Sequence, residues 1–200
     1  RRQRQMCIRD RFVCFFTFFC TKTEAQQTPQ FSQNMFNKLA NNPGFAGSKE
    51  AICATALHRQ QWIGFGEGRP VTTNLSVDAG IPAIFGGIGL NIVNETIGQF
   101  DNLGLQLSYA YRTELGNGQI GTGISLGMYQ NSLDGSSLVP ASSGDPALPT
   151  ADAQGSALDV GFGIYFNSED AYIGLSSSNI TEPTIEWENA TTQKLVRHYY

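Results

Sequence analysis

Hydrophobic and polar residues alternate with a period of two along several stretches of the chain. In LGLQLSYAYRT, residues 103–113, one set of positions begins Leu, Leu, Leu, Tyr, Tyr, and the other reads Gly, Gln, Ser, Ala, Arg. Residues 120–128 and 158–166 alternate in the same way. Most of their glycines lie opposite the apolar set, together with Ser125 in the first stretch and Asp159 in the second. This pattern predicts β-strands that have one apolar face and one small or polar face.

The alternation predicts seven strands and the start of an eighth near Arg197. The connections after the second, fourth and sixth strands are short, whereas the other four, residues 63–70, 94–102, 131–156 and 181–196, are longer. Outer-membrane barrels show the same alternation of short periplasmic turns and long extracellular loops, and strands of about 9–11 residues cross the membrane. The seven predicted strands cover residues 51–62, 71–80, 84–93, 103–113, 119–130, 157–167 and 171–180.

We therefore predict an all-β fold, an antiparallel transmembrane outer-membrane β-barrel of which about seven to eight strands are present. The chain has 22 glycines, and those in the predicted strands lie mainly on the polar face, which would line the lumen. The apolar face would meet lipid, with Tyr109, Tyr111 and Phe166 in an aromatic girdle. A soluble secreted β-sandwich remains the alternative, because its strands alternate as well.

The first 25 residues have a different character. A basic stretch, residues 1–11, precedes the nine-residue apolar run FVCFFTFFC and then TKTEA. This arrangement predicts a signal peptide over residues 1–25, since a membrane-spanning helix needs about 20 apolar residues. RRQRQMCIRDR also resembles a translated sequencing-adapter tract, so we expect part of it to be foreign. Residues 26–48 then form a periplasmic or lumenal segment, and residues 49–200 a barrel domain that we expect to continue in the native gene.

Without residues 1–25, the chain keeps 7 basic and 15 acidic residues, a formal charge of −8. This acidic balance and the lack of a basic patch argue against a nucleic-acid partner. Only Cys53 remains among the cysteines, so this part of the chain forms no intrachain disulfide.

The candidate chemical motifs are weak. His58 and His198 lie far apart without Glu or Cys at ligand spacing, Ser125 lacks the surrounding nucleophile-elbow motif, and Gly86–Gly87 do not begin a G-x-G-x-x-G motif. The acidic residues of the connection after the fifth strand do not have the spacing of a calcium loop. We expect no catalytic, cofactor-binding or metal site and no cofactor. That connection, being long and rich in Ser, Pro, Ala and Gly, is instead a candidate partner-binding loop; its acidic residues are Asp134, Asp145 and Asp152.

A series of short motifs, in order along residues 26–200, resembles the PorP/SprF family of Bacteroidetes outer-membrane proteins. The series opens with PQFSQ at residues 29–33 and with Asn42–Pro43, Phe45 and Ala46–Gly47. Lys38 departs from the family pattern, which usually has a small residue or proline there. The further motifs are ALHRQQW, GIGLNIVNETIGQF, LSYAYR, SLDGSSL, GFGIYF, AYIGLSSSNI and RHYY.

The resemblance implies a non-enzymatic outer-membrane β-barrel of the type IX secretion and gliding machinery, with secreted cargo, other secretion components and outer-membrane lipid as partners. Such a protein would support secretion or surface attachment of specific cargo. A passive channel or small-solute uptake barrel and a soluble adhesin stay open as alternatives. We also hypothesise that residues 26–48 enter the lumen or pack at its periplasmic mouth. There their amides would pair with polar wall residues, and Phe31, Phe36 and Phe45 would fill gaps beside glycines.

Overall fold

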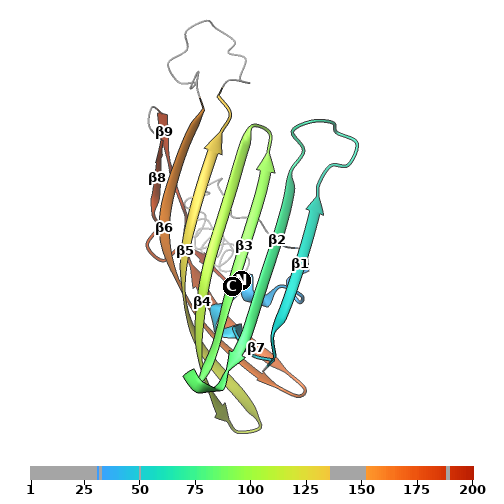
Figure 1. The fold of residues 1–200 in the computed structure, drawn as a ribbon, viewed down its shortest axis with the longest axis vertical. Helices are drawn as coiled ribbons and strands as arrows, with labels where there is room; N and C mark the ends of the chain where they lie inside the picture. The colour runs from blue at the N-terminus through green and yellow to red at the C-terminus, as the bar shows by residue number, and fades with distance from the viewer. Residues whose placement is uncertain (1–30, 32, 50, 136–151, 188–189) are drawn as a thin grey trace, which may run out of the picture.

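One curved antiparallel sheet dominates the computed structural model, which describes residues 31–200 except 32, 50, 136–151 and 188–189 (Figure 1). Eight strands pair in the order β1-β2-β3-β4-β5-β6-β7-β10, and β8 and β9 form a separate hairpin. The strands are β1 (Cys53–Gln60), β2 (Val71–Ile81), β3 (Gly86–Ile97), β4 (Phe100–Leu115), β5 (Gly118–Leu133), β6 (Ala153–Ser168), β7 (Tyr172–Ser178), β8 (Thr184–Trp187), β9 (Ala190–Lys194) and β10 (His198–Tyr199).

The sheet confirms the predicted fold class, a partial antiparallel β-barrel. Each of β1 to β6 pairs with its successor, as in an up-and-down barrel. The predicted eighth strand is present as β10, which pairs with β7 through His198 and Tyr199. No helix among the described residues is long and apolar enough to span a membrane.

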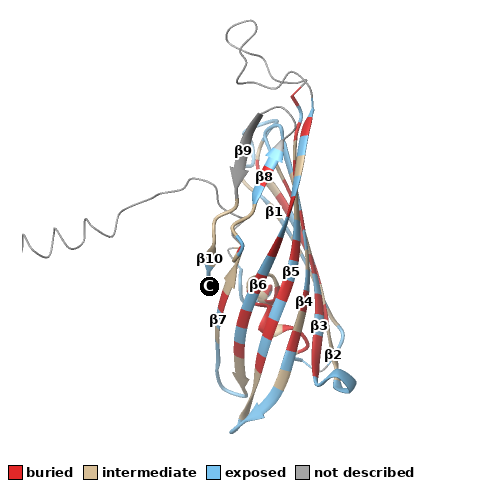
Figure 2. Ribbon diagram, turned by 90° about the vertical axis from the view of Figure 1, so that its left-hand side faces the viewer, coloured by how far each residue is buried: buried red, intermediate tan, exposed pale blue. Residues whose placement is uncertain are grey.

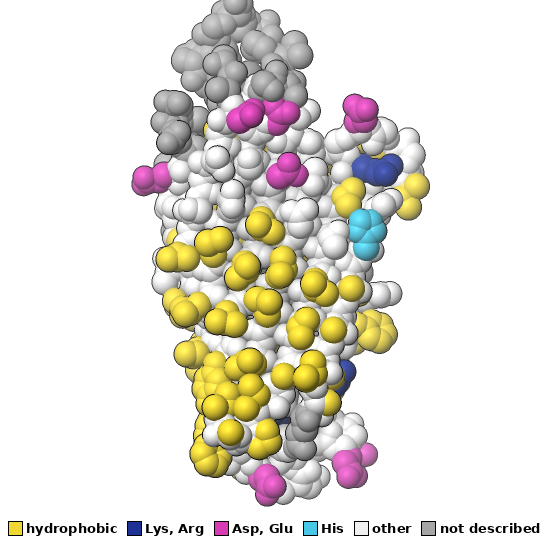
Figure 3. All heavy atoms as spheres, viewed as in Figure 1, with side chains coloured by type: hydrophobic (Ala, Val, Ile, Leu, Met, Phe, Trp, Pro, Cys, Tyr) yellow, Lys and Arg dark blue, Asp and Glu magenta, His cyan; other side chains and the backbone are white. Residues whose placement is uncertain are grey.

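The two faces of the sheet differ as the alternation predicts. Asn74, Ser108 and Ser125 on the inner face are at most 2% exposed, whereas Leu126 and Leu158 on the outer face are 63% and 74% exposed. Buried and exposed residues alternate along β5 and β6 in Figure 2, and apolar side chains form a band on the outer face in Figure 3. A sandwich would cover this outer apolar face with a second sheet, which the described residues do not provide.

The predicted alternation of short and long connections is wrong at one place. Residues 94–102 do not form a loop, because β3 and β4 extend to a two-residue turn, Gly98 and Gln99. The polar residues of this stretch suggested a loop, but they pair across the strands. Thr72 donates to Glu95 (3.2 Å) and Thr96 to Asp101 (2.8 Å). The strands therefore continue beyond the apolar band as a polar ladder.

A second predicted connection also contains regular structure, since residues 181–196 include the hairpin β8–β9. Ile185 of this hairpin is 2% exposed. The turns at the opposite end of the sheet are short, as predicted. The β2–β3 connection includes the 3-10 helix η2 (Pro82–Ile84), and the β4–β5 turn holds only Gly116 and Asn117.

Candidate functional site: a segment docked in the lumen

Residues 33–49, which we call the lumenal segment, lie against the inner face of the sheet (Figure 1). The segment contains the short helix α2 (Lys38–Asn41) and the 3-10 helix η1 (Pro43–Phe45). Leu39 and Ala46 are 2% and 0% exposed and form a small apolar cluster with Ala110 of β4. The segment therefore packs inside the curved sheet, as hypothesised from the sequence.

Glycines provide the surface on which the segment lies. A Cβ added to Gly123 would come within 2.5 Å of the backbone nitrogen of Gly44, and one added to Gly87 would lie 2.5 Å from the Cα of Gly47. A Cβ on Gly89 would lie 2.6 Å from a methyl carbon of Leu39. Any side chain at these positions would occupy space that the segment fills. Close approach of the segment's backbone therefore explains Gly87 and Gly123, and the Leu39 side chain explains Gly89.

Two asparagines of the segment make hydrogen bonds that bury their amides. Asn37 donates to Asn74 (2.7 Å) and accepts from Ser76 (3.2 Å), so its amide bonds to two residues of β2. Asn42 accepts from the backbone of Gly44 (2.9 Å) and donates to the carbonyl of Ile164 on β6 (3.0 Å). Because unpaired buried amides are costly, these bonds fix the position of the segment across the sheet.

Charged wall residues bind the backbone of the segment. The Asp78 carboxylate accepts from the Gly47 N–H (3.0 Å), and Gly47 has a φ of +70°, which glycine adopts without strain. The Arg112 guanidinium donates to the Gly44 carbonyl (3.1 Å) and to Asn167 (2.7 Å). Each charge thus binds a backbone group of opposite polarity.

Lys38, the residue that departs from the family pattern, lies among aromatic rings. Its Nζ is 3.3 Å from the centroid of the Tyr172 ring and donates to the Tyr165 hydroxyl (3.1 Å). Phe45 packs edge-on against Tyr165, with the ring centroids 5.2 Å apart. The cation over the Tyr172 ring joins the segment to β7 through a cation–π interaction.

The sequence hypothesis was right about the amides and only partly right about the aromatic residues. Phe36 is 61% exposed, so its predicted burial is wrong. Phe45 is half-buried against Tyr165, and Phe31 lines a cavity above the segment. The space above the glycines is filled instead by Leu39, Pro43, Gly44 and Ala46.

The cavity beyond the segment has a volume of about 130 Å³. Its lining includes Phe31, Tyr129 and several amide side chains, among them Asn102 and Asn131, which hydrogen-bond each other. The Tyr129 ring lies beside Gly104 and Gly127, where an added Cβ would approach it to 3.2 and 3.3 Å. Amides, aromatic rings and apolar side chains make up most of this lining, which also includes the Glu95 carboxylate.

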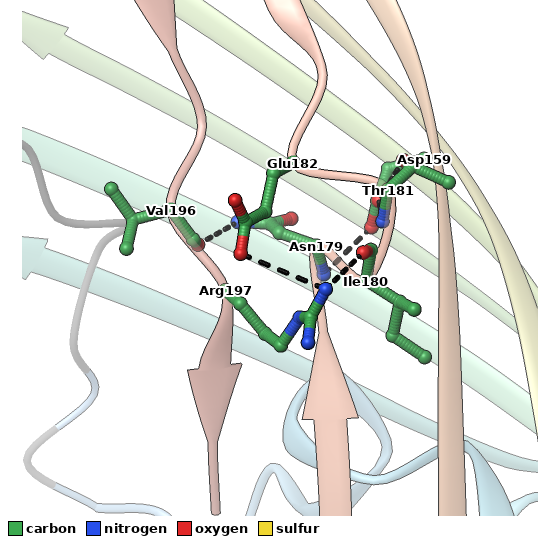
Figure 4. Close-up of polar contacts among 7 residues, drawn as sticks. All are labelled: Asp159, Asn179, Ile180, Thr181, Glu182, Val196 and Arg197. Atoms are coloured by element: carbon green, nitrogen blue, oxygen red, sulfur yellow. Dashed lines mark hydrogen bonds and ion pairs between the residues drawn. The ribbon is translucent and has the colours of Figure 1, made fainter.

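Asp159 of β6 organises the connection that follows β7 (Figure 4). Its carboxylate accepts from the Asn179 N–H (2.8 Å) and from the Thr181 hydroxyl (2.7 Å). Asn179 in turn donates to the carbonyl of Val196 (2.9 Å), and Arg197 donates to the carbonyl of Ile180 (2.7 Å). These bonds hold the connection against β6 and place β10 beside β7.

The other candidate residues do not come together. His58 points outward from β1 and hydrogen-bonds Thr73 (2.9 Å), whereas His198 lies at the other edge of the sheet. Ser125 is buried in β5 and accepts from Gln106 (2.9 Å). The described part of the chain contains no group of three potential metal ligands. Asp134 and Asp152 lie at the two ends of the connection between β5 and β6, and Asp145 lies outside the described residues.

Comparison with protein families settles which proteins this chain is related to. A family model described as "Type IX secretion system membrane protein PorP/SprF" matches residues 23–200. The chain belongs to the PorP/SprF family. Searches of curated proteins and of solved structures gave no match.

Membership of the PorP/SprF family fits the structure described above. The family consists of membrane proteins of the type IX secretion system, and the outward apolar band gives this chain a face suited to lipid. The matched range includes the whole lumenal segment as well as the strands. The segment is therefore part of the region that the family shares.

Proposed function

We propose that this PorP/SprF protein is an outer-membrane component of the type IX secretion and gliding machinery that supports secretion or surface attachment of specific cargo proteins. The observation that carries the proposal is the docked lumenal segment. Seven hydrogen bonds of 2.6 to 3.2 Å join it to the wall among the described residues. A filled lumen leaves little room for solutes to pass. It therefore suits a protein that holds a partner, and it suits a solute channel less well.

The outer-membrane location is supported by the apolar band. On β4 the outward apolar residues run from Leu103 to Tyr111, and on β6 from Leu158 to Phe166. Eight residue steps of about 3.3 Å on strands tilted by roughly 40° span about 20 Å of the membrane normal. This is close to the band of about 25 Å found on outer-membrane barrels. Outer-membrane lipid is thus one proposed partner, and cargo and secretion components are the others.

The proposed role is non-enzymatic. Asn37, Asn74 and Asp78 are polar groups of the lumen whose hydrogen bonds are made with one another or with the segment. Covalent catalysis requires a nucleophile and a base at hydrogen-bonding distance. Ser125 bonds to Gln106 and not to a base, and the Thr73 hydroxyl that His58 contacts is exposed on the outward face of β2. The proposal also keeps residues 1–25 as a signal peptide and residues 26–48 as the first part of the exported protein.

The alternative function is a passive channel or small-solute uptake barrel, and conductance separates it from the proposed role. We expect the full-length protein in a planar bilayer to show no steady open pore, because the lumenal segment occupies the lower lumen. A variant that lacks residues 28–45 should conduct small ions or fail to assemble. A steady open pore in the unaltered protein would favour the channel. If the unaltered protein and the deletion variant had the same conductance, the segment would not be what blocks the lumen.

A further inference from the structure

The loop between β1 and β2, residues 61–70, exposes three apolar side chains in four residues. Trp62, Ile63 and Phe65 are 65%, 81% and 72% exposed, and the rings of Trp62 and Phe65 contact each other with centroids 5.8 Å apart. We call these three residues the aromatic tip. A contiguous exposed apolar group of this kind marks an interaction site more often than an isolated exposed residue does.

The aromatic tip is held in one shape by its backbone. Phe65 N–H donates to the Trp62 carbonyl (2.9 Å), and Gln61 N–H donates to Pro70 (3.0 Å), which closes the loop at its base. Gly68 accepts from Gly98 in the β3–β4 turn (3.0 Å) and so joins two neighbouring connections. These backbone bonds lower the ordering cost that the loop would pay at the moment of contact.

The aromatic tip lies next to the lipid-facing surface. His58 on β1 and its partner Thr73 on β2 are outward polar residues at the end of the apolar band, and the loop begins three residues after His58. Figure 3 shows hydrophobic side chains on this loop close to the upper border of the band. Two outward rows therefore separate the tip from the band, the first with His58 and Thr73 and the second with Gln60.

The charges around the tip also suit a lipid interface. The only charged residues of the loop are Glu67 and Arg69, one of each sign. Such a loop carries no net charge, so it neither repels anionic headgroups nor selects a charged protein surface. Tryptophan is enriched at membrane interfaces because its ring is apolar while its N–H stays in contact with polar groups.

We propose that the aromatic tip inserts into the headgroup and upper acyl region of the adjacent leaflet and anchors the β1–β2 loop to the membrane surface. The occupant is lipid and not a protein, because the tip lies near the border of the lipid-facing band and its three residues carry no charge for partner selection. The inference does not depend on the cargo-related function and would hold equally for a channel.

The test uses the fluorescence of Trp62, since the chain contains only Trp62 and Trp187. The full-length protein with Trp187→Phe, and any further tryptophan replaced, is reconstituted into phosphatidylcholine vesicles with and without bromine on the acyl chains. A matched positive control carries Leu126→Trp together with Trp62→Phe in the same background, because Leu126 lies in the middle of the outer face and is 63% exposed. Trp62 emission should be quenched by the brominated lipid to an extent comparable with this control, and poorly by aqueous iodide.

The opposite pattern would overturn the proposal. If iodide quenched Trp62 strongly while brominated lipid left its emission unchanged, the tip would lie in water. Protection from both quenchers would place the tip under protein, and lipid would then be the wrong occupant. Failure of the cargo-related function leaves the quenching unchanged, so the two outcomes are distinguishable.

Discussion

Replacement of Gly123 by valine should lift the lumenal segment from the wall. The new Cβ would lie within 2.5 Å of the Gly44 nitrogen, where about 3.4 Å is comfortable, and the contact is with backbone, which no rotamer change relieves. The segment must therefore move by about 1 Å at Pro43 and Gly44. Gly123 lies on β5, whose ladders with β4 and β6 do not depend on its side chain.

The size of the effect follows from the bonds nearest to this contact. A shift of that size weakens the Arg112 bond to the Gly44 carbonyl and the Asn42 bond to the Ile164 carbonyl. A bond to a charged donor is worth about 1.5–3 kcal/mol and a neutral one about 1 kcal/mol, so the loss is roughly 3 kcal/mol. This corresponds to a change of about a hundredfold in the docking equilibrium.

The assay is hydrogen exchange of the lumenal segment in detergent-solubilised full-length protein. Protection of residues 38–47 should fall by about a hundredfold in the Gly123→Val protein, while protection of β4 to β6 is retained. The matched control is Thr122→Val, which places the same side chain on the outward face of the adjacent position. If protection of the segment in Gly123→Val equalled that in Thr122→Val, the explanation that the segment needs the bare backbone of Gly123 would be refuted.

Three further changes have defined outcomes. Asp159→Ala removes the acceptor of the Asn179 N–H and leaves it without that partner, so the connection after β7 should lose about 2–3 kcal/mol of protection against exchange. Asn74 is 0% exposed and accepts a hydrogen bond from the buried Asn37 amide, which Asn74→Leu removes. The free energy of unfolding should therefore fall by about 1–3 kcal/mol in a denaturant titration. Lys38→Met removes the cation over the Tyr172 ring, and proteolysis of the segment should become several-fold faster, as expected for a loss of about 1 kcal/mol.

Outward-facing and exposed residues supply the controls for these three variants. Leu126→Ala changes the lipid face and Lys49→Met removes an exposed charge near the end of the segment. Neither should alter exchange after β7 or proteolysis of the segment. If Asp159→Ala behaved like Leu126→Ala, or Lys38→Met like Lys49→Met, the corresponding contact would have no role in holding these elements.

The fold could be read from the sequence because a strand's two faces have opposite surroundings. An exposed apolar face on one side and a packed lumen on the other impose a strict period of two, as at Leu126 and Ser125. The β3–β4 turn could not be read in this way. Beyond the apolar band both faces are polar, so the period disappears at Glu95 and Asn102 although the backbone pairing continues. The hairpin β8–β9 was also missed.

The lumenal segment was also only partly predictable. Its many amides and the glycines opposite them suggested a polar segment against a bare wall. Which side chain meets which glycine depends on the path of the backbone, which local sequence does not determine. Leu39 and Pro43 therefore occupy positions that the sequence hypothesis gave to phenylalanines, and Arg112 and Asp78 gave no sign that they would bind backbone groups.

Deletion of the full-length gene in its own organism tests the cargo-related function most directly. The surface and culture-medium proteomes are compared with and without the gene, and the gene is restored in a second strain. Selective loss of one or a few surface proteins, with other secretion intact and recovery on restoration, is the expected result. An unchanged set of secreted proteins together with altered uptake of a small solute would contradict the proposed function and identify the barrel as a channel.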